Sequence, residues 1–328
     1  MEEAIKNFNK QFAWKAKVEH GEKLKGKSTF IVGGMGGSNL ATRLALIAKP
    51  ELDLVIHQDY GLPRLSSKRF EEALCIASSF SGNTEEAIDF AEQALKKNLP
   101  LAVIAKGGKL LEFAKKHSLP HVVLPPTTIQ PRSGLGFQIV ALATLIGNEK
   151  LVQELSKLAS LLRPSELEDR GEALADTLRT RVPVICSSLR NSAVAYNWKI
   201  KFNETGKIPS FYNVFPELNH NEMTGFDVIG TTESLSHKFH FIFLTDSADQ
   251  PQIQKRMKIT KTLYENRGLS VVKVPFQGKT PLERIFSSLL IADWTALHLS
   301  RIYGTEAEQV PMVEEFKKLI TDNSSPNN

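Results

Sequence analysis

Cysteine is scarce in this chain of 328 residues, which contains only Cys75 and Cys186. Each lies in an apolar run, so we expect two buried free thiols in a reducing compartment rather than a disulfide framework. Long uninterrupted apolar runs are also missing. The longest apolar region, residues 282–303, is broken by charged residues such as Glu283 and Asp293, which favours a buried helix over a membrane span.

The chain also lacks a strong excess of charge, and its first residues lack the pattern of an export signal. Lys and Arg number 41 against 36 Asp and Glu, a formal net charge of +5, and the basic residues are scattered. This balance disfavours a nucleic-acid partner and suits a small anionic substrate. The opening MEEAIKNFNKQF has neither the basic start nor the apolar core of a signal peptide. We therefore expect a cytoplasmic protein with no membrane partner.

The hydrophobic pattern predicts an α/β fold with mainly parallel sheets. In the first half, short apolar runs alternate with helical segments, and residues 137–146 form a helix that is apolar on nearly all sides. Strands that are apolar along their whole length are typical of parallel sheets covered by helices on both faces, a three-layer α/β/α arrangement. The predicted strands of this half are 29–32, 52–57, 74–78, 101–105 and 121–124.

The second half repeats this alternation less regularly after a polar, helical stretch that Pro164 interrupts. The predicted strands are 182–187, 211–214, 239–245 and 269–274, and the predicted helices are 193–202, 252–266, 282–303 and 310–320. The expected units are an N-terminal domain over 1–150, a helical connector over 151–180, a C-terminal domain over 181–320 and a disordered tail over 321–328.

Two turns that each follow a strand and precede a helix have the composition of a phosphate cradle. The first is Thr29-Phe-Ile-Val-Gly-Gly-Met-Gly-Gly-Ser38 and the second is Ser78-Ser-Phe-Ser-Gly-Asn-Thr-Glu-Glu86. Glycine lets backbone N–H groups come close to an anion, and a helix N-terminus adds a favourable dipole. The candidate phosphate-binding residues are Gly36, Gly37, Ser38, Ser79, Ser81 and Thr84.

Each turn by itself also has a plainer interpretation. The first could be a tight structural turn, or part of a dinucleotide site with Asp53 or Asp59 as its acid, although the third glycine of that fingerprint is missing. In the second, Ser81, Asn83 or Thr84 could be a helix N-cap. One hydroxyl is enough for a cap, however, and this loop supplies several. The Walker sequence of nucleotide hydrolases is absent.

The two loops at this spacing resemble the sugar isomerase (SIS) domain, which implies a five-stranded parallel sheet with helices on both sides. Three later segments make the resemblance more specific: Gln130-Pro-Arg132, Asn203-Glu-Thr-Gly-Lys-Ile-Pro209 and Glu217-Leu-Asn-His-Asn-Glu222. With the loops, they resemble the bifunctional phosphoglucose/phosphomannose isomerase family from about residue 25 to 320. Judged locally, Arg132 would be a solvated helix-entry residue and Glu204 a surface glutamate.

The resemblance implies an aldose–ketose isomerase that needs no metal or redox cofactor. It would interconvert glucose 6-phosphate and mannose 6-phosphate with fructose 6-phosphate through ring opening and a cis-enediol. Glu204 would be the base, Arg132 would stabilise the enediolate, and His220 and Lys317 would open the ring. Lys318 is an adjacent candidate for the role of Lys317. A homodimer in which His220 reaches the neighbouring subunit's site is also implied.

Three other functions fit parts of the sequence. A zinc-dependent mannose phosphate isomerase would use Glu217-x-x-His220 as half of a metal site, but no second such pair occurs and the eight histidines are dispersed. A non-catalytic sugar-phosphate sensor would keep the loops without needing Glu204, His220 and Lys317 together, and we recognise no DNA-binding module. An SIS-type isomerase of another sugar phosphate would more often have a single SIS domain.

Overall fold

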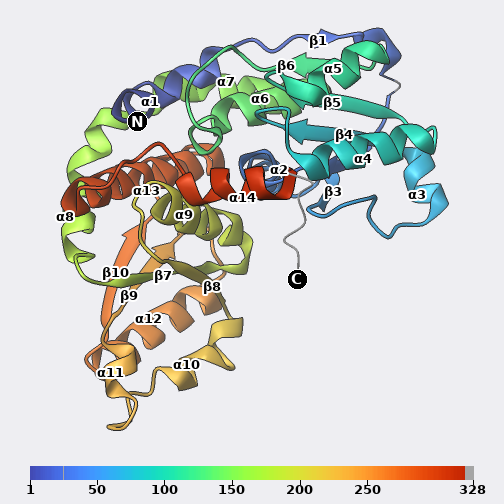
Figure 1. Ribbon diagram of the computed structural model, residues 1–328. Helices are drawn as coiled ribbons and strands as arrows, with labels where there is room; N and C mark the ends of the chain where they lie inside the picture. Colours follow the sequence, from blue (N-terminus) through green and yellow to red (C-terminus); the bar gives the residue numbers. More distant parts are fainter. Residues whose placement is uncertain (25, 322–328) are drawn as a thin grey trace, which may run out of the picture.

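Two sheets with a shared layer of helices between them make up the protein (Figure 1). The structure is a computed structural model that describes residues 1–24 and 26–321. The tail predicted to be disordered, residues 321–328, lies outside the described residues except for Thr321, which ends the last helix.

The first sheet has six strands in the order β1-β6-β5-β4-β2-β3. Five of them are parallel and are the five that the sequence predicts. The sixth, β1, pairs antiparallel with β6 and was missed because its two residues are too few to show a pattern. The strands are β1 (Val18–Glu19), β2 (Thr29–Gly33), β3 (Asp53–His57), β4 (Ala73–Ser79), β5 (Leu101–Ala105) and β6 (His121–Val123).

The second sheet is parallel throughout, with the order β10-β9-β7-β8. In each sheet the first parallel strand of the half lies between the second and the third, so the two halves share one winding order. This confirms the predicted pair of α/β halves with mainly parallel sheets. The strands are β7 (Val182–Ser188), β8 (Phe211–Phe215), β9 (Phe239–Thr245) and β10 (Ser270–Pro275).

Helices cover both faces of each sheet, as the fully apolar strands predict. The outer face of the first sheet carries α4 (Glu85–Lys96) and α5 (Gly108–Lys116). The outer face of the second carries α12 (Pro251–Glu265). One continuous core joins the inner faces through α2 (Gly36–Ala48), α6 (Leu135–Leu145), α7 (Glu149–Leu161), α8 (Glu168–Thr177), α9 (Ser192–Glu204) and α13 (Pro281–Tyr303).

Five further helices are short or lie at the periphery: α1 (Glu2–Lys6), α3 (Ser67–Glu72), α10 (Glu222–Gly225), α11 (Glu233–Ser236) and α14 (Pro311–Thr321). The division into domains at residues 150 and 180 stays a prediction. The predicted connector contains most of α7 and all of α8, and both helices belong to the shared layer.

The longest apolar region forms α13, which is buried along its middle as predicted. The Thr280 side chain caps its first turn by accepting the Glu283 N–H, and Gly304 ends it in the left-handed conformation at φ +61°. Gly171 of α8 lies so close that an added Cβ would stand 2.3 Å from the Cβ of Trp294. Among the described residues, no helix has the combined length and apolarity to cross a membrane.

Both cysteines are buried free thiols, which confirms the prediction for Cys75 and Cys186. Burial raises the pKa of Cys75 to about 12, and it raises the pKa of Cys186 well above its usual range. Buried thiols that stay protonated at neutral pH are poor nucleophiles. Neither cysteine is therefore a candidate for the chemistry of the site.

Candidate active site

The two predicted phosphate loops lie side by side at the carboxyl edge of the first sheet. β2 and β4 are adjacent and parallel, with Gly33 opposite Ala77, and the loops after them lead into α2 and α4. From β2 the chain goes to β3 on one side, whereas from β4 it goes to β5 on the other, so the winding reverses here. Ligands of open α/β sheets bind in the crevice at such a reversal.

In the second loop, the hydroxyls bond to the loop itself and do not cap the helix. The Ser79 Oγ accepts the Gly82 N–H at 3.0 Å and lies 2.7 Å from the Thr84 Oγ1. Ser81 is exposed, and Thr84 occupies the N-cap position without a side-chain cap bond. Gly82 has φ +78°, and a Cβ there would stand 1.7 Å from the Gly107 oxygen. Only glycine fits this position, so the loop has one well-defined course.

The first loop is bonded to the second. Gly36 begins α2 with φ +50° and open space around it, and the buried Ser38 Oγ accepts the Phe80 N–H at 3.1 Å. The position of Asp53 excludes it as the acid of a dinucleotide site. Asp53 stands at the amino end of β3, away from the loops, where it accepts a hydrogen bond from the Thr29 hydroxyl.

Arg132 is buried, so the local interpretation of a solvated side chain is wrong. Its side chain is 3% exposed and makes four hydrogen bonds. Nε donates to the Thr205 Oγ1 at 2.9 Å, and Nη1 donates to the Glu204 Oε2 at 3.2 Å. Nη2 donates to the carbonyl oxygens of Ala307 and Glu308, each at 2.8 Å. The guanidinium thus joins the end of α9 to the chain between α13 and α14.

The turn that carries Arg132 packs on both phosphate loops. A Cβ on Gly37 would stand 3.0 Å from the Pro131 oxygen, and a Cβ on Gly134 would stand 2.4 Å from the Phe80 ring. These close approaches place the Arg132 turn against the start of α2 and against the second loop. The phosphate loops and the Arg132–Glu204 pair therefore belong to one region, at the junction of the two halves.

Two charged residues of this region were missed by the sequence analysis. The Lys207 Nζ donates to the Glu204 carbonyl oxygen at 2.6 Å and also to the carbonyl of Gln309. Burial and the Arg132 charge lower the pKa of Lys207. The Glu306 carboxylate accepts the N–H groups of residues 308 and 309. Lys207 could have been noticed, since it lies in the same short segment as Glu204, but no sequence signal marks Glu306.

His220 is not linked to this region within one chain, among the residues that the structure describes. His220 is exposed after the turn that follows β8, and across residues 1–24 and 26–321 no hydrogen bond or ion pair joins it to Glu204 or Arg132. Lys317 lies on α14, where its Nζ pairs with Glu314 at 2.7 Å. In Figure 1, α14 lies across the middle of the view, whereas α10, which follows His220, lies near the bottom.

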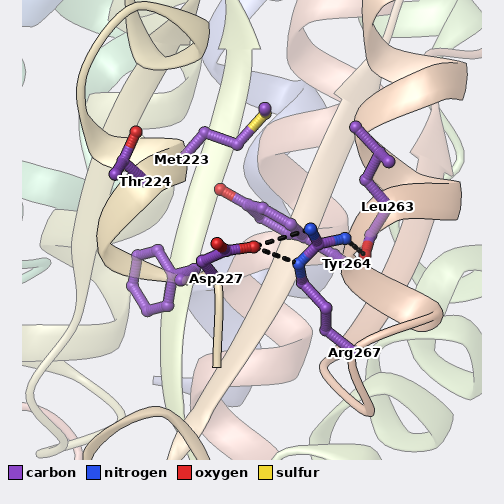
Figure 2. Close-up of a pocket in the computed structure, with 7 residues that line it drawn as sticks. Met223, Thr224, Asp227, Leu263, Tyr264 and Arg267 are labelled. Atoms are coloured by element: carbon purple, nitrogen blue, oxygen red, sulfur yellow. Dashed lines mark hydrogen bonds and ion pairs between the residues drawn. The ribbon is translucent and has the colours of Figure 1, made fainter. Parts of the chain in front are cut away.

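A cavity of about 180 Å³ lies elsewhere, between α10 and α12 (Figure 2). The Arg267 Nε donates to the Asp227 carboxylate at 2.6 Å across its wall. None of the predicted site residues lines it. In the part of the chain that the structure describes, no three His, Cys, Asp or Glu side chains gather as a metal-binding group.

Comparison with known proteins identifies the family of the chain. Residues 167–320 match the family model described as the bacterial phospho-glucose isomerase C-terminal SIS domain. The chain is 31% identical to a bifunctional phosphoglucose/phosphomannose isomerase of Caldicellulosiruptor bescii over 89% of both chains. It is 28% identical to the protein of the same name from Aquifex aeolicus over 96% of both chains.

A solved structure shares the fold. Tagatose-6-phosphate ketose/aldose isomerase from Escherichia coli superimposes with a TM-score of 0.68 at 14% identity, covering 94% of this chain and 95% of the other. The sequence relationship goes further than the fold, because identity above 30% extends over most of the chain. This protein therefore belongs to the bifunctional phosphoglucose/phosphomannose isomerase family.

Proposed function

We propose that the protein interconverts glucose 6-phosphate and mannose 6-phosphate with fructose 6-phosphate. The observation that carries the proposal is the Arg132–Glu204 pair, in which a buried guanidinium meets a carboxylate at 3.2 Å beside the two phosphate loops. The Glu204 side chain is 40% exposed and can contact a substrate. Arg132 is buried and is held in place by its hydrogen bonds to Thr205, Ala307 and Glu308. A base next to fixed positive charge is what proton transfer at a carbon beside a carbonyl requires.

The phosphate loops would hold the substrate by the group that does not react. Backbone N–H groups near Gly36 and Gly37 and the hydroxyls of the second loop surround the start of two helices, where the dipoles favour an anion. Ser38, Ser79, Ser81 and Thr84 would supply hydroxyl groups for this task. Binding the phosphate fixes the distance from the sugar carbons to Glu204, so part of the entropic cost of reaction is met on binding.

Glu204 would take the proton from C2 of the open aldose and return it to C1. The carbonyl then moves from C1 to C2, and the hydroxyl proton moves from O2 to O1. Once Glu204 is protonated, Arg132 loses its counter-ion at the moment when negative charge develops on the substrate oxygens. Arg132 therefore attracts the substrate oxygens more strongly in the transition state than in the ground state, which is the condition for catalysis.

A coupled assay tests this function. Purified protein with EDTA is given fructose 6-phosphate, and glucose 6-phosphate and mannose 6-phosphate are quantified separately. Formation of both products is expected. Glucose 6-phosphate alone would narrow the substrate range. No turnover, with fructose 6-phosphate still raising the melting temperature, would favour a sugar-phosphate sensor instead.

We further propose that the functional unit is a homodimer in which His220 enters the site of the partner subunit. His220 is exposed and has no bond to Glu204 in its own chain, among the residues described. Five apolar side chains of α14 are 45–82% exposed: Met312, Val313, Phe316, Leu319 and Ile320. An apolar helix face of this kind is typical of a surface that another subunit covers. Lys317 on the same helix would then complete the ring-opening pair.

Mixing two inactive variants tests the shared site. Glu204→Gln and His220→Ala are each expected to be inactive as homodimers. After subunit exchange in an equal mixture, half of the dimers have one site with both residues intact, so activity should return to about one quarter of wild type. Glu204→Gln mixed with Arg132→Lys is the control and should stay inactive, because both residues belong to one chain's site. Failure of the first mixture to recover activity would show that His220 does not act across an interface.

A further inference from the structure

A buried ion pair lies one helical turn from the proposed site and takes no part in the reaction described above. The Lys201 Nζ on α9 donates to the Asp293 Oδ1 on α13 at 2.5 Å, and the two side chains are 1% and 4% exposed. The pair lies in the helical layer between the sheets. It joins residues that are 92 positions apart in the sequence.

Holding two helices together does not account for these charges. Each charge loses its hydration on burial, and apolar residues of similar volume often stabilise such a helix pair equally well. α9 and α13 already share the apolar core, and the Trp198 Nε1 donates to the Ser288 Oγ at 3.0 Å between them. The reason for the ion pair must therefore be sought in the groups that surround it.

The pair is connected to Arg132 indirectly, through the backbone of α9 and the Thr205 side chain. The Lys201 carbonyl accepts the Thr205 N–H at 2.9 Å, and the Thr205 Oγ1 accepts the Arg132 Nε at 2.9 Å. Lys201 and Thr205 are four residues apart and share one face of α9. Burial raises the pKa of Asp293, whereas the charges of Lys201 and Arg132 both oppose that rise. Arg132, Lys201 and Asp293 thus form one buried cluster, with Glu204 at its solvent side.

The charges of this cluster are balanced only while Glu204 is ionised. Arg132 and Lys201 carry two positive charges, and Asp293 and Glu204 carry two negative ones. The other charged groups that act on this region, Lys207 from the turn after α9 and Glu306 from the segment after α13, are also of opposite sign. When Glu204 takes a proton from the substrate, one positive charge remains in a place that water screens poorly.

We propose that Lys201 and Asp293 are positioning residues that hold the last turn of α9 under Arg132 and keep the cluster neutral until Glu204 is protonated. The proposal rests on the proposed isomerase function, because it takes Glu204 as the base. It predicts that the two members of the pair have opposite effects on the reaction's pH dependence. A purely structural pair would have no such effect.

Two single variants test the charge balance. Asp293→Asn keeps the hydrogen bond from Lys201 and the side-chain volume, and it leaves one extra positive charge that favours the ionised base. The acid limb of the pH profile of kcat/KM should move to lower pH by about half a unit or more. Lys201→Met leaves one extra negative charge, which disfavours the ionised base. The acid limb of its kcat/KM profile should therefore move to higher pH. Limbs that stay in place, or that move in the same direction, would overturn the proposal.

A double variant decides the question if a single variant does not fold. Lys201→Met with Asp293→Leu leaves no unpaired charge in the interior, so we expect it to fold with a melting temperature near that of wild type. It also keeps the charge balance, so it tests the positioning role alone. Its kcat should fall at least about fivefold with KM unchanged, since Met and Leu no longer fix the last turn of α9 under Arg132. An unchanged kcat in this folded variant would refute the positioning role.

A matched control and the wild type separate the possible failures. Lys49→Met breaks a partly buried pair with Glu154, 2.8 Å long, between the end of α2 and α7 and away from the site. It should lower stability without moving the acid limb. Wild-type protein that turns over no sugar phosphate would disprove the proposed function itself. Wild-type turnover with unmoved limbs in both single variants would disprove only the role of Lys201 and Asp293.

Discussion

Glu204→Gln is expected to lower kcat by about 10²–10⁴-fold while KM for fructose 6-phosphate changes little. Glutamine keeps the shape of the side chain and can still accept the hydrogen bond from the Arg132 Nη1, but it cannot take a proton from carbon. The side chain is 40% exposed, so the protein should fold as before. The coupled assay gives kcat and KM, and thermal unfolding gives the stability.

A surface glutamate provides the control for this substitution. Glu265 on α12 is 44% exposed and pairs with Lys261, outside the proposed site. Glu265→Gln should leave both kcat and the melting temperature close to wild type. If Glu204→Gln behaves in the same way, Glu204 is not the base and the proton-transfer assignment is wrong.

Arg132→Lys is the second substitution with a large expected effect. It should lower kcat by about 10²–10³-fold, because a donor fixed at the developing oxyanion is lost. It should also lower the free energy of unfolding by about 2–4 kcal/mol, since buried acceptors lose their donors. Lysine keeps the positive charge but cannot reach Thr205, Glu204 and two carbonyl groups together, as the planar guanidinium does. Steady-state kinetics and denaturant unfolding measure the two losses separately.

Another poorly exposed arginine shows whether the kinetic loss follows from instability alone. Arg284 in the first turn of α13 is 15% exposed and pairs with Asp246 at 3.3 Å. Arg284→Lys should cost stability without lowering kcat. If Arg132→Lys loses stability but keeps its kcat, the guanidinium is only a structural link between α9 and the chain after α13.

Most of the fold could be predicted because its elements have strong local patterns. All five parallel strands of the first sheet and all four of the second were found, since most of them are apolar runs between turn residues. β8 and β10 are partly exposed and carry polar residues, so their patterns are weaker. The buried helix α13 was recognised by its length and its apolar content. β1 was missed, because a strand of two residues is defined by its partner β6 rather than by its own sequence.

The site was predictable only in part. The two phosphate loops are contiguous segments with a recognisable composition, and the structure brings them together at the point where the winding reverses. Local reasoning about Arg132 failed, because its surroundings come from α9 and from residues 307 and 308. Lys207 and Glu306 were missed for the same reason. The roles assigned to His220 and Lys317 stay predictions.

The sequence by itself determined the order of strands and helices, the two hydroxyl-rich loops and the set of groups available for chemistry. Those features depend on spacing and composition over a few residues, which a linear pattern contains. Only the tertiary structure decided that Arg132 meets Glu204 across 72 residues and that Lys201 meets Asp293 across 92. Such contacts depend on how α9 and α13 pack in the layer between two sheets. That packing follows from burying apolar faces of many elements at once, and no single segment contains it.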